Sequence, residues 1–192
     1  MINGHMISAE INGIKLRFET AASSFSPRFI DRGTLAMLSA ADLTGGSRLL
    51  DLGCGYGVAG IYAAKLIGAQ NVIMSDVDGV SVELSKKNAA INGVGDIKVI
   101  LSDGFTGITE SGFTHILSNP PYQADFAVPK RFIEKGFNRL QLGGKLIMVT
   151  RRKLWYKNKL IAIFGGVKIV ETDGYYVFIA EKRGSQYAKS LK

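Results

Sequence analysis

A short apolar strand that leads into a glycine loop and then a helix constrains this chain more than any other segment. The apolar residues 48–52 lead into Asp51-Leu52-Gly53-Cys54-Gly55-Tyr56-Gly57, and helical spacing then continues to about residue 67. Glycine lets the backbone turn tightly and approach a bound molecule closely, while a helix N-terminus favours an anionic group. The segment therefore predicts an α/β sheet with a ligand at the carboxyl end of its first strand.

Strands alternate with helices along the rest of the chain, which supports this fold class. Apolar runs predict strands at 71–76, 97–101, 115–118 and 145–150, and helical spacing predicts helices at 33–41, 57–67, 80–91, 128–140 and 152–164. Such alternation is typical of a parallel sheet with helices on both faces. We expect Gly143-Gly144 to stop the helix at 128–140. Two closing strands, 167–172 and 175–181, would turn at Asp173-Gly174 and add an antiparallel strand.

We interpret the chain as one domain with a small extension at its start. Asn12-Gly13 lies between alternating residues and is a strong hairpin signal, so residues 7–19 are expected to form two short strands. Residues 1–22 then form a hairpin extension, and residues 23–192 form the α/β domain. A length of 192 residues suits this division.

Composition narrows the chemistry that this domain can perform. Cys54 is the only cysteine and there are 2 histidines, so no intramolecular disulfide or cysteine-based metal cluster is available, and we expect no metal. No apolar run approaches the roughly 18 residues of a membrane span, and the first residues show no basic-then-apolar leader. We therefore expect a cytoplasmic protein that does not interact with membranes.

Carboxylates follow three of the predicted strands, at the sheet edge where such folds bind ligands. Asp51 could attract the ammonium group of an amino acid whose carboxylate lies at the helix N-terminus. Asp76 ends the second strand and is placed to accept both hydroxyls of a ribose. Asp103 follows the third strand and could accept the exocyclic amine of adenine.

A dinucleotide is the rival ligand. Gly55, Gly57 and Gly60 also satisfy the G-x-G-x-x-G pattern of dinucleotide-binding folds. That pattern alone is weakly specific, and it leaves Asp51 and a later motif at Asn119 without a role.

The most informative segment is Asn119-Pro120-Pro121-Tyr122, directly after the fourth strand. Two prolines fix the loop and remove two backbone donors, so its carbonyl groups face the site as acceptors. Together with the Asn119 side-chain carbonyl, they can hold both hydrogens of a planar amine and leave its nitrogen lone pair aimed at an incoming methyl group. Tyr122 offers a ring face on which the acceptor can stack. The segment predicts an amino nitrogen as the methyl acceptor.

In this order, the motifs resemble those of the class I S-adenosylmethionine-dependent methyltransferases that methylate amino nitrogens (EC 2.1.1). Upstream, Phe25-Ser26-Pro27 and Asp31-Arg32-Gly33-Thr34 resemble the segment before the glycine loop in a narrower group. That group is the ribosomal RNA guanine-N2 methyltransferases of the RsmC type, the "methyltransferase small" domain. The resemblance implies a Rossmann-like sheet of order 3-2-1-4-5-7-6 with strand 7 antiparallel. It also implies S-adenosylmethionine as cofactor, with Asp31 and Thr34 beside its methionine end.

Two sets of candidate site residues follow from the motifs and the resemblance. The cofactor-binding candidates are Asp31, Thr34, Asp51, Gly53, Cys54, Gly55, Gly57, Asp76, Val77, Asp103, Gly104 and Asn119. The catalytic candidates are Asn119, Pro120, Pro121 and Tyr122.

Positive charge is concentrated in the last third of the chain. Residues 1–128 carry 9 Lys/Arg against 12 Asp/Glu, whereas residues 129–192 carry 15 against 4, which together give the net charge of +8. A polyanion such as RNA is one explanation and a solubilising surface is the other. Arg151, Arg152 and Lys153 follow the fifth strand, at the edge of the site, and are the candidate RNA-binding residues.

Three functions follow from these observations. The first is in-line methyl transfer to the N2 amine of guanine in ribosomal RNA. The second is methylation of a protein glutamine amide, since release-factor methyltransferases share Asn-Pro-Pro-Tyr. The third is a non-catalytic module that binds nucleotide or RNA, because a fold does not settle function. Two features depart from the RsmC pattern: no room remains for a second copy of the domain, and His115 stands where an aspartate commonly begins the strand.

Overall fold

The structure is a computed structural model of the chain, and it describes residues 5–22, 24, 26–121 and 125–188. No helix within these residues is both long and apolar enough to cross a membrane.

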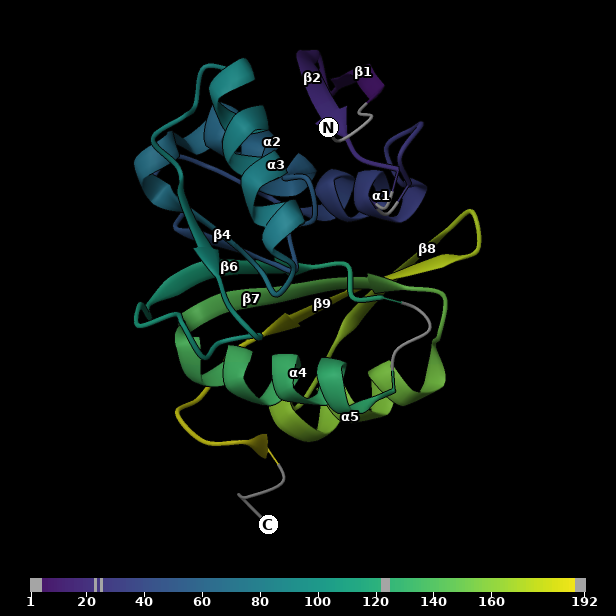
Figure 1. The fold of residues 1–192 in the computed structure, drawn as a ribbon. Coiled ribbons are helices and arrows are strands. Elements are labelled where there is room, and N and C mark those ends of the chain that lie inside the picture. Colours follow the sequence, from purple (N-terminus) through teal and green to yellow (C-terminus); the bar gives the residue numbers. More distant parts are fainter. Residues whose placement is uncertain (1–4, 23, 25, 122–124, 189–192) are drawn as a thin grey trace.

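A seven-stranded sheet forms the centre of the molecule (Figure 1). From edge to edge its strands are β5 (Lys98–Leu101), β4 (Val72–Asp76), β3 (Leu49–Leu52), β6 (Phe113–Ser118), β7 (Leu140–Thr150), β9 (Tyr175–Glu181) and β8 (Lys168–Thr172). Strand β9 is antiparallel to both neighbours, and the pairs from β5 to β7 are parallel. Counted from β3, the order is 3-2-1-4-5-7-6 with the seventh strand antiparallel, so the predicted Rossmann-like topology is confirmed.

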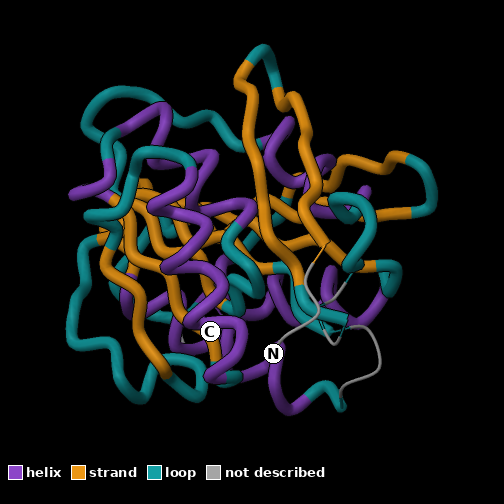
Figure 2. The backbone as a smooth tube through the Cα atoms, turned by 45° about the horizontal axis from the view of Figure 1, so that its top comes forward, coloured by secondary structure: helices purple, strands orange, loops and turns teal. Residues whose placement is uncertain are grey.

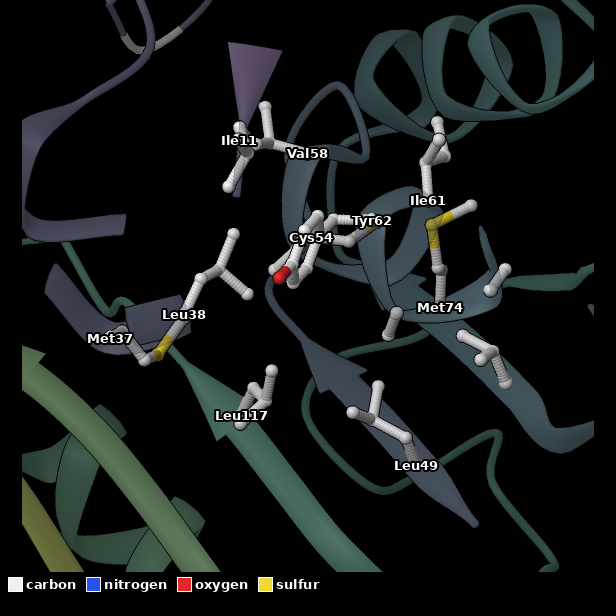
Figure 3. Close-up of a cluster of buried hydrophobic side chains, with 14 of the residues drawn as sticks. Ile11, Met37, Leu38, Leu49, Cys54, Val58, Ile61, Tyr62, Met74 and Leu117 are labelled. Atoms are coloured by element: carbon white, nitrogen blue, oxygen red, sulfur yellow. The ribbon is translucent and has the colours of Figure 1, made fainter. Parts of the chain in front are cut away.

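Helices cover both faces of the sheet, as expected for parallel strands that need buried surfaces on each side (Figure 1). One layer holds α1 (Arg32–Ala40), α2 (Val58–Ile67) and α3 (Gly79–Ile91), with a short 3-10 helix, η1 (Ala69–Asn71), after α2. The opposite layer holds α4 (Ala127–Arg139) and α5 (Leu154–Phe164). Mostly aliphatic side chains fill the first layer's core, together with aromatic rings such as Tyr62 (Figure 3), whereas the second core holds more aromatic rings, among them Phe137 and Phe178.

The N-terminal hairpin consists of β1 (His5–Ile11) and β2 (Ile14–Thr20), and it forms a separate two-stranded sheet (Figure 2). Its turn uses left-handed conformations at Asn12 and Gly13, with φ of 48° and 81°, as the Asn-Gly signal predicts. Two asparagines, one within α3 and one at its C-cap, attach the hairpin to the rest of the chain. Asn88 and Asn92 each accept from one β2 amide and donate to one β2 carbonyl, at residues 19 and 17 respectively.

One predicted element boundary is wrong. Helix α4 ends at Arg139, and strand β7 begins at the next residue, so Gly143-Gly144 lies inside the strand and does not stop the helix. The register of β7 against β6 shifts between Phe113 and His115. A side chain at residue 144 would lie 2.7 Å from the Phe113 carbonyl oxygen, so the glycine allows the two backbones to approach closely at this irregularity.

Candidate active site

The loops that follow the parallel strands enclose a pocket of about 410 Å³ at the carboxyl edge of the sheet. Most of the predicted residues line it. They are Asp31, Thr34, Asp51, Gly53, Cys54, Gly55, Asp76, Val77, Asp103, Gly104, Asn119, Pro120 and Pro121. Gly57 does not line the pocket, and Tyr122 lies outside the described residues.

The glycine loop presents bare backbone to this pocket. Gly53 and Gly55 have φ of 77° and 56°, and a Cβ atom at either position would meet only open space. Such left-handed conformations strain residues that carry a side chain. Gly57, with φ of 96°, is the N-cap of α2, and a Cβ atom there would lie 3.0 Å from Ile61 Cδ1. Val58 and Ala59, the first residues of α2, do line the pocket.

Asp51 lies at the base of the pocket and is almost completely buried. Its Oδ2 accepts the Gly60 amide at 2.7 Å. Gly60 can approach because it has no side chain, and a Cβ there would lie 2.4 Å from Met74 Cγ. The pKa of Asp51 is raised to about 7, mainly by burial. The charge of Asp76 also raises it, and the hydrogen bond from the Gly60 amide acts in the opposite direction. The carboxyl group is thus poised to ionise when a cation is bound beside it.

Asp76 joins the glycine loop to the end of β4. Its Oδ2 accepts the Gly55 amide at 2.8 Å, and its Oδ1 accepts the Asp78 amide at 3.0 Å. Each carboxylate oxygen has a second lone pair for a ligand. Because the side chain is half-buried and lines the pocket, it presents these acceptors to a bound hydroxyl pair.

Asp103 has a partner that the sequence did not predict. Both of its oxygens accept from the guanidinium of Arg131 on α4, each at 3.1 Å. Both side chains are about half exposed, and exposed ion pairs of this kind contribute little to stability. The pair therefore opposes the approach of a ligand amine to Asp103 only weakly.

Asn119 meets two residues of the upstream segment that are more than 80 positions away. Its Nδ2 donates to Asp31 Oδ2 at 2.8 Å and to Thr34 Oγ1 at 3.0 Å. A carboxylate can only accept, so this contact orients the amide, with Nδ2 toward Asp31 and Oδ1 on the opposite side. Asp31 is itself fixed as the N-cap of α1, since Oδ2 also accepts the Thr34 amide at 2.9 Å.

Several pocket residues were missed by the sequence analysis. They are Ser24, Met37, Leu52, Tyr56, Val58, Ala59, Ser81, Ser102, Val128 and Phe132. Tyr56 was inside the predicted glycine loop, and burial raises the pKa of its phenol to about 12, with a further contribution from the charge of Asp31. Val128 and Phe132 lie four residues apart on α4, so apolar spacing after the Asn119 motif was a usable signal for the pocket wall.

The basic triplet lies at the same edge of the sheet as the pocket, directly after β7. Arg152 is 5.0 Å from the centroid of the Phe126 ring, and Lys153 is 4.8 Å from that of Tyr176 and pairs with Glu171 at 3.2 Å. The Arg151 guanidinium instead contacts Tyr175, which lies inside the molecule. All three side chains of the triplet are nevertheless exposed.

His115 lies away from the pocket, as expected for a strand residue. It pairs with Leu49 and Lys145 near the beginning of the sheet strands, and its ring is buried. Burial lowers the pKa of its imidazole, and the nearby charge of Lys145 lowers it further. His115 is therefore a neutral core residue.

The pocket matches the chemical groups of S-adenosylmethionine. Its volume is within the usual range for small-molecule sites. Asp76 offers acceptors for ribose hydroxyls, Asp51 lies where an ammonium group can approach, and the positive end of α2 suits a carboxylate. The fold and this pocket define an S-adenosylmethionine-dependent methyltransferase. Residues 15–179 match the Methyltransferase small domain, and the chain belongs to that family.

Relatives in this family differ in length. The chain is 32% identical to the Bacillus subtilis protein YbxB over 173 residues, covering 86% of this chain and 85% of YbxB. It is also 32% identical to the ribosomal RNA small subunit methyltransferase C of Pseudoalteromonas atlantica, covering 82% of this chain but 47% of that protein. A solved structure of the T. thermophilus 16S rRNA N2 methyltransferase RsmC, in complex with AdoMet and guanosine, superposes with a TM-score of 0.86 at 28% identity. It covers 95% of this chain and 51% of RsmC, so the chain spans about half the length of the RsmC relatives.

Proposed function

We propose that this chain methylates the exocyclic N2 amine of guanine in ribosomal RNA. The orientation of the Asn119 amide is the observation that carries the proposal. Nδ2 donates to Asp31 Oδ2 and to Thr34 Oγ1, which turns the carbonyl oxygen Oδ1, the acceptor of this amide, away from Asp31. A carbonyl acceptor selects a substrate group that donates hydrogen, such as a planar amine.

The residues of this chain would hold the amine for attack. Asn119 Oδ1 and the Pro120 carbonyl would accept its two hydrogens, which directs the nitrogen lone pair away from the loop. S-adenosylmethionine supplies the methyl group in an already activated sulfonium form. Correct placement of two reactants contributes on the order of 7–11 kcal/mol to rate enhancement. A stacking role for Tyr122 remains a prediction.

RNA is favoured as the acceptor by the relatives and by the charge of the pocket edge. Two of the similar proteins described above are methyltransferases of ribosomal RNA. Arg152 and Lys153 are exposed at the carboxyl edge of the sheet, where they can neutralise phosphates beside the pocket. A guanine held in RNA structure would have to leave its stack to reach Asn119.

The product of methyl transfer tests this proposal. Purified protein is incubated with isotopically labelled S-adenosylmethionine and ribosomal RNA that lacks its natural methylation, and the nucleosides are analysed by mass spectrometry. Labelled N2-methylguanosine is the expected product. Label in N5-methylglutamine of a ribosomal or release-factor protein, with none in RNA, would establish the glutamine amide instead. Cofactor binding without transfer to RNA or protein would favour the non-catalytic module.

If Arg152 and Lys153 contact RNA phosphates, removing their charges should weaken the dependence of RNA affinity on salt concentration. For single-stranded RNA, log affinity falls with log salt by about 0.7 for each neutralised phosphate. Replacing Arg152 and Lys153 by glutamine is expected to reduce the slope by about 1.4, because two phosphate contacts are lost. Fluorescence anisotropy with labelled RNA at several salt concentrations measures the slope, and calorimetry should show unchanged S-adenosylmethionine affinity.

A control variant removes the same charge from the opposite edge. Lys135 on α4 and Arg183 after β9 are both exposed, and β9 ends beside the first half of β7. The Lys135→Gln, Arg183→Gln variant is expected to keep nearly the whole slope. Equal slopes in all three proteins would show that RNA does not bind along the Arg152 edge.

A further inference from the structure

Strand β9, the last strand in the sequence, places the phenol of one tyrosine at the active site. Tyr175 is the first residue of β9, and because β9 is antiparallel to β7, its start lies beside the end of β7 at Thr150. Its hydroxyl donates to Asp31 Oδ1 at 3.3 Å, across 144 positions of sequence. The side chain is only 5% exposed, so packing fixes the ring. A residue far outside the motifs therefore contacts the carboxylate that orients Asn119.

Arg151 holds this phenol from the other side. Its Nη2 donates to the Tyr175 hydroxyl oxygen at 2.9 Å, and its guanidinium carbon lies 4.7 Å from the ring centroid. Since the phenol oxygen accepts from Arg151, the phenol hydrogen is directed to the carboxylate, which can only accept. The hydrogen bonds run from Arg151 through Tyr175 to Asp31, and Asn119 meets the same carboxylate at its other oxygen.

The first turn of α1 leaves the space that the ring occupies. A Cβ atom at Gly33 would lie 2.8 Å from Tyr175 Cε1 and 2.8 Å from Asp31 Oδ2. Such distances are far below van der Waals contact, so any side chain at this position would displace the ring, the carboxylate or both. The glycine between Asp31 and Thr34 is therefore required by the Tyr175 contact.

We propose that Tyr175 is a positioning residue that fixes the Asn119 amide through Asp31, and that Arg151 holds Tyr175 in place. This inference rests on the proposed role of Asn119 as the acceptor of the substrate amine. Asp31 Oδ2 carries the contacts to Asn119 and to the α1 amide, and Oδ1 carries the contact to Tyr175. Without the phenol, the carboxylate is held through its Oδ2 contacts and loses the restraint at Oδ1, so Oδ1 of Asn119 leaves the productive orientation for part of the time. Small misplacements of a reacting group can lower rates strongly.

Removing the phenol oxygen tests the positioning role. Tyr175→Phe keeps the ring and its packing, and it is expected to lower kcat about ten-fold, the scale of one lost hydrogen bond to a charged group. KM and Kd for S-adenosylmethionine should change less than two-fold. Tyr62→Phe is the matched control, because Tyr62 is equally buried and its hydroxyl accepts one side-chain hydrogen bond, from Asn12, outside the pocket. The control should keep the wild-type kcat.

A second variant shows whether Tyr175 acts through Asn119. In an Asn119→Ala background, adding Tyr175→Phe is expected to lower kcat no further, since the amide that it positions is already gone. Multiplicative losses, or an equal loss of kcat in Tyr62→Phe, would overturn the inference by showing an independent or general structural effect.

An activity-independent measurement separates this inference from the proposed function. The side-chain amide signals of Asn119, assigned in NMR spectra by their loss in Asn119→Ala, should shift and exchange faster in Tyr175→Phe but not in Tyr62→Phe. If no acceptor is methylated by the wild-type protein, the proposed function fails while the NMR result still decides the inference. Unchanged Asn119 signals in Tyr175→Phe would overturn the inference even if guanine is methylated.

Discussion

Replacing Asn119 by alanine is expected to lower the rate of methyl transfer by about 10²–10³-fold, the usual cost of losing one preorganised hydrogen-bonding group at a reacting centre. Affinity for S-adenosylmethionine should remain within about two-fold. Asn119→Asp should be equally slow although it keeps an acceptor oxygen, because it cannot donate to Asp31 and it places two carboxylates together. Single-turnover rates and calorimetric affinities measure the two effects separately.

Asn138→Ala provides the control for this prediction. Asn138 is an exposed asparagine of α4 whose Nδ2 donates to the Tyr187 hydroxyl at 3.2 Å, away from the pocket. Its replacement should leave the rate unchanged. Near wild-type transfer by Asn119→Ala or by Asn119→Asp would show that this amide does not hold the acceptor amine.

Replacing Asp51 by asparagine is expected to stabilise the free protein above pH 7 while weakening cofactor binding. The pKa of Asp51 is about 7 in the folded chain, whereas that of an unperturbed aspartate side chain is 3.8. Between these two values the folded protein keeps a proton that the unfolded chain releases, so the free energy of unfolding falls as pH rises and then levels off above about pH 7. About three pKa units correspond to roughly 4 kcal/mol.

Chemical denaturation at several pH values between 4 and 8 measures this effect. Asp51→Asn should lack the decline that the wild-type protein shows, whereas Asp96→Asn, which replaces an exposed carboxylate, should retain it. A cation bound beside Asp51 favours its charged form, so cofactor affinity of the wild-type protein should rise as pH passes through about 7. Parallel stability curves for the wild-type protein and Asp51→Asn would mean that Asp51 is already ionised in the free pocket.

The sequence analysis succeeded where function depends on local order along the chain. The glycine loop and Asn119 each follow a strand directly, and Asp76 is the last residue of one. Because parallel strands all end at one edge of the sheet, the convergence of these residues followed from the element pattern. The family resemblance placed Asp31 and Thr34 beside the methionine end of the cofactor, but the contact between Asp31 and Asn119 was not predicted, because the two residues are 88 positions apart and no local rule joins them.

Contacts set by tertiary packing could not be predicted in the same way. The Arg131 pair with Asp103 depends on how α4 lies over the sheet, and nothing in either local sequence indicates the partner. Tyr175 was assigned only to a closing strand, since its contact with Asp31 requires both the antiparallel insertion of β9 and the missing side chain at Gly33. Arg151 was predicted only as a candidate RNA-binding residue; it is exposed, and its contact with the Tyr175 hydroxyl was not foreseen for the same reason.

The insertion of β9, a late strand of the sequence, between β7 and β8 has a consequence for synthesis of the protein. Every described residue that lines the pocket precedes residue 133, so a chain growing from its N-terminus contains the whole cofactor-binding wall before α5 and β9 exist. Tyr175 appears more than forty residues later and enters the sheet between β7 and β8. On our inference, the growing polypeptide contains every described residue that lines the pocket well before it contains the residue that positions the catalytic amide. The full rate of methyl transfer is therefore expected only once the final hairpin has folded into place.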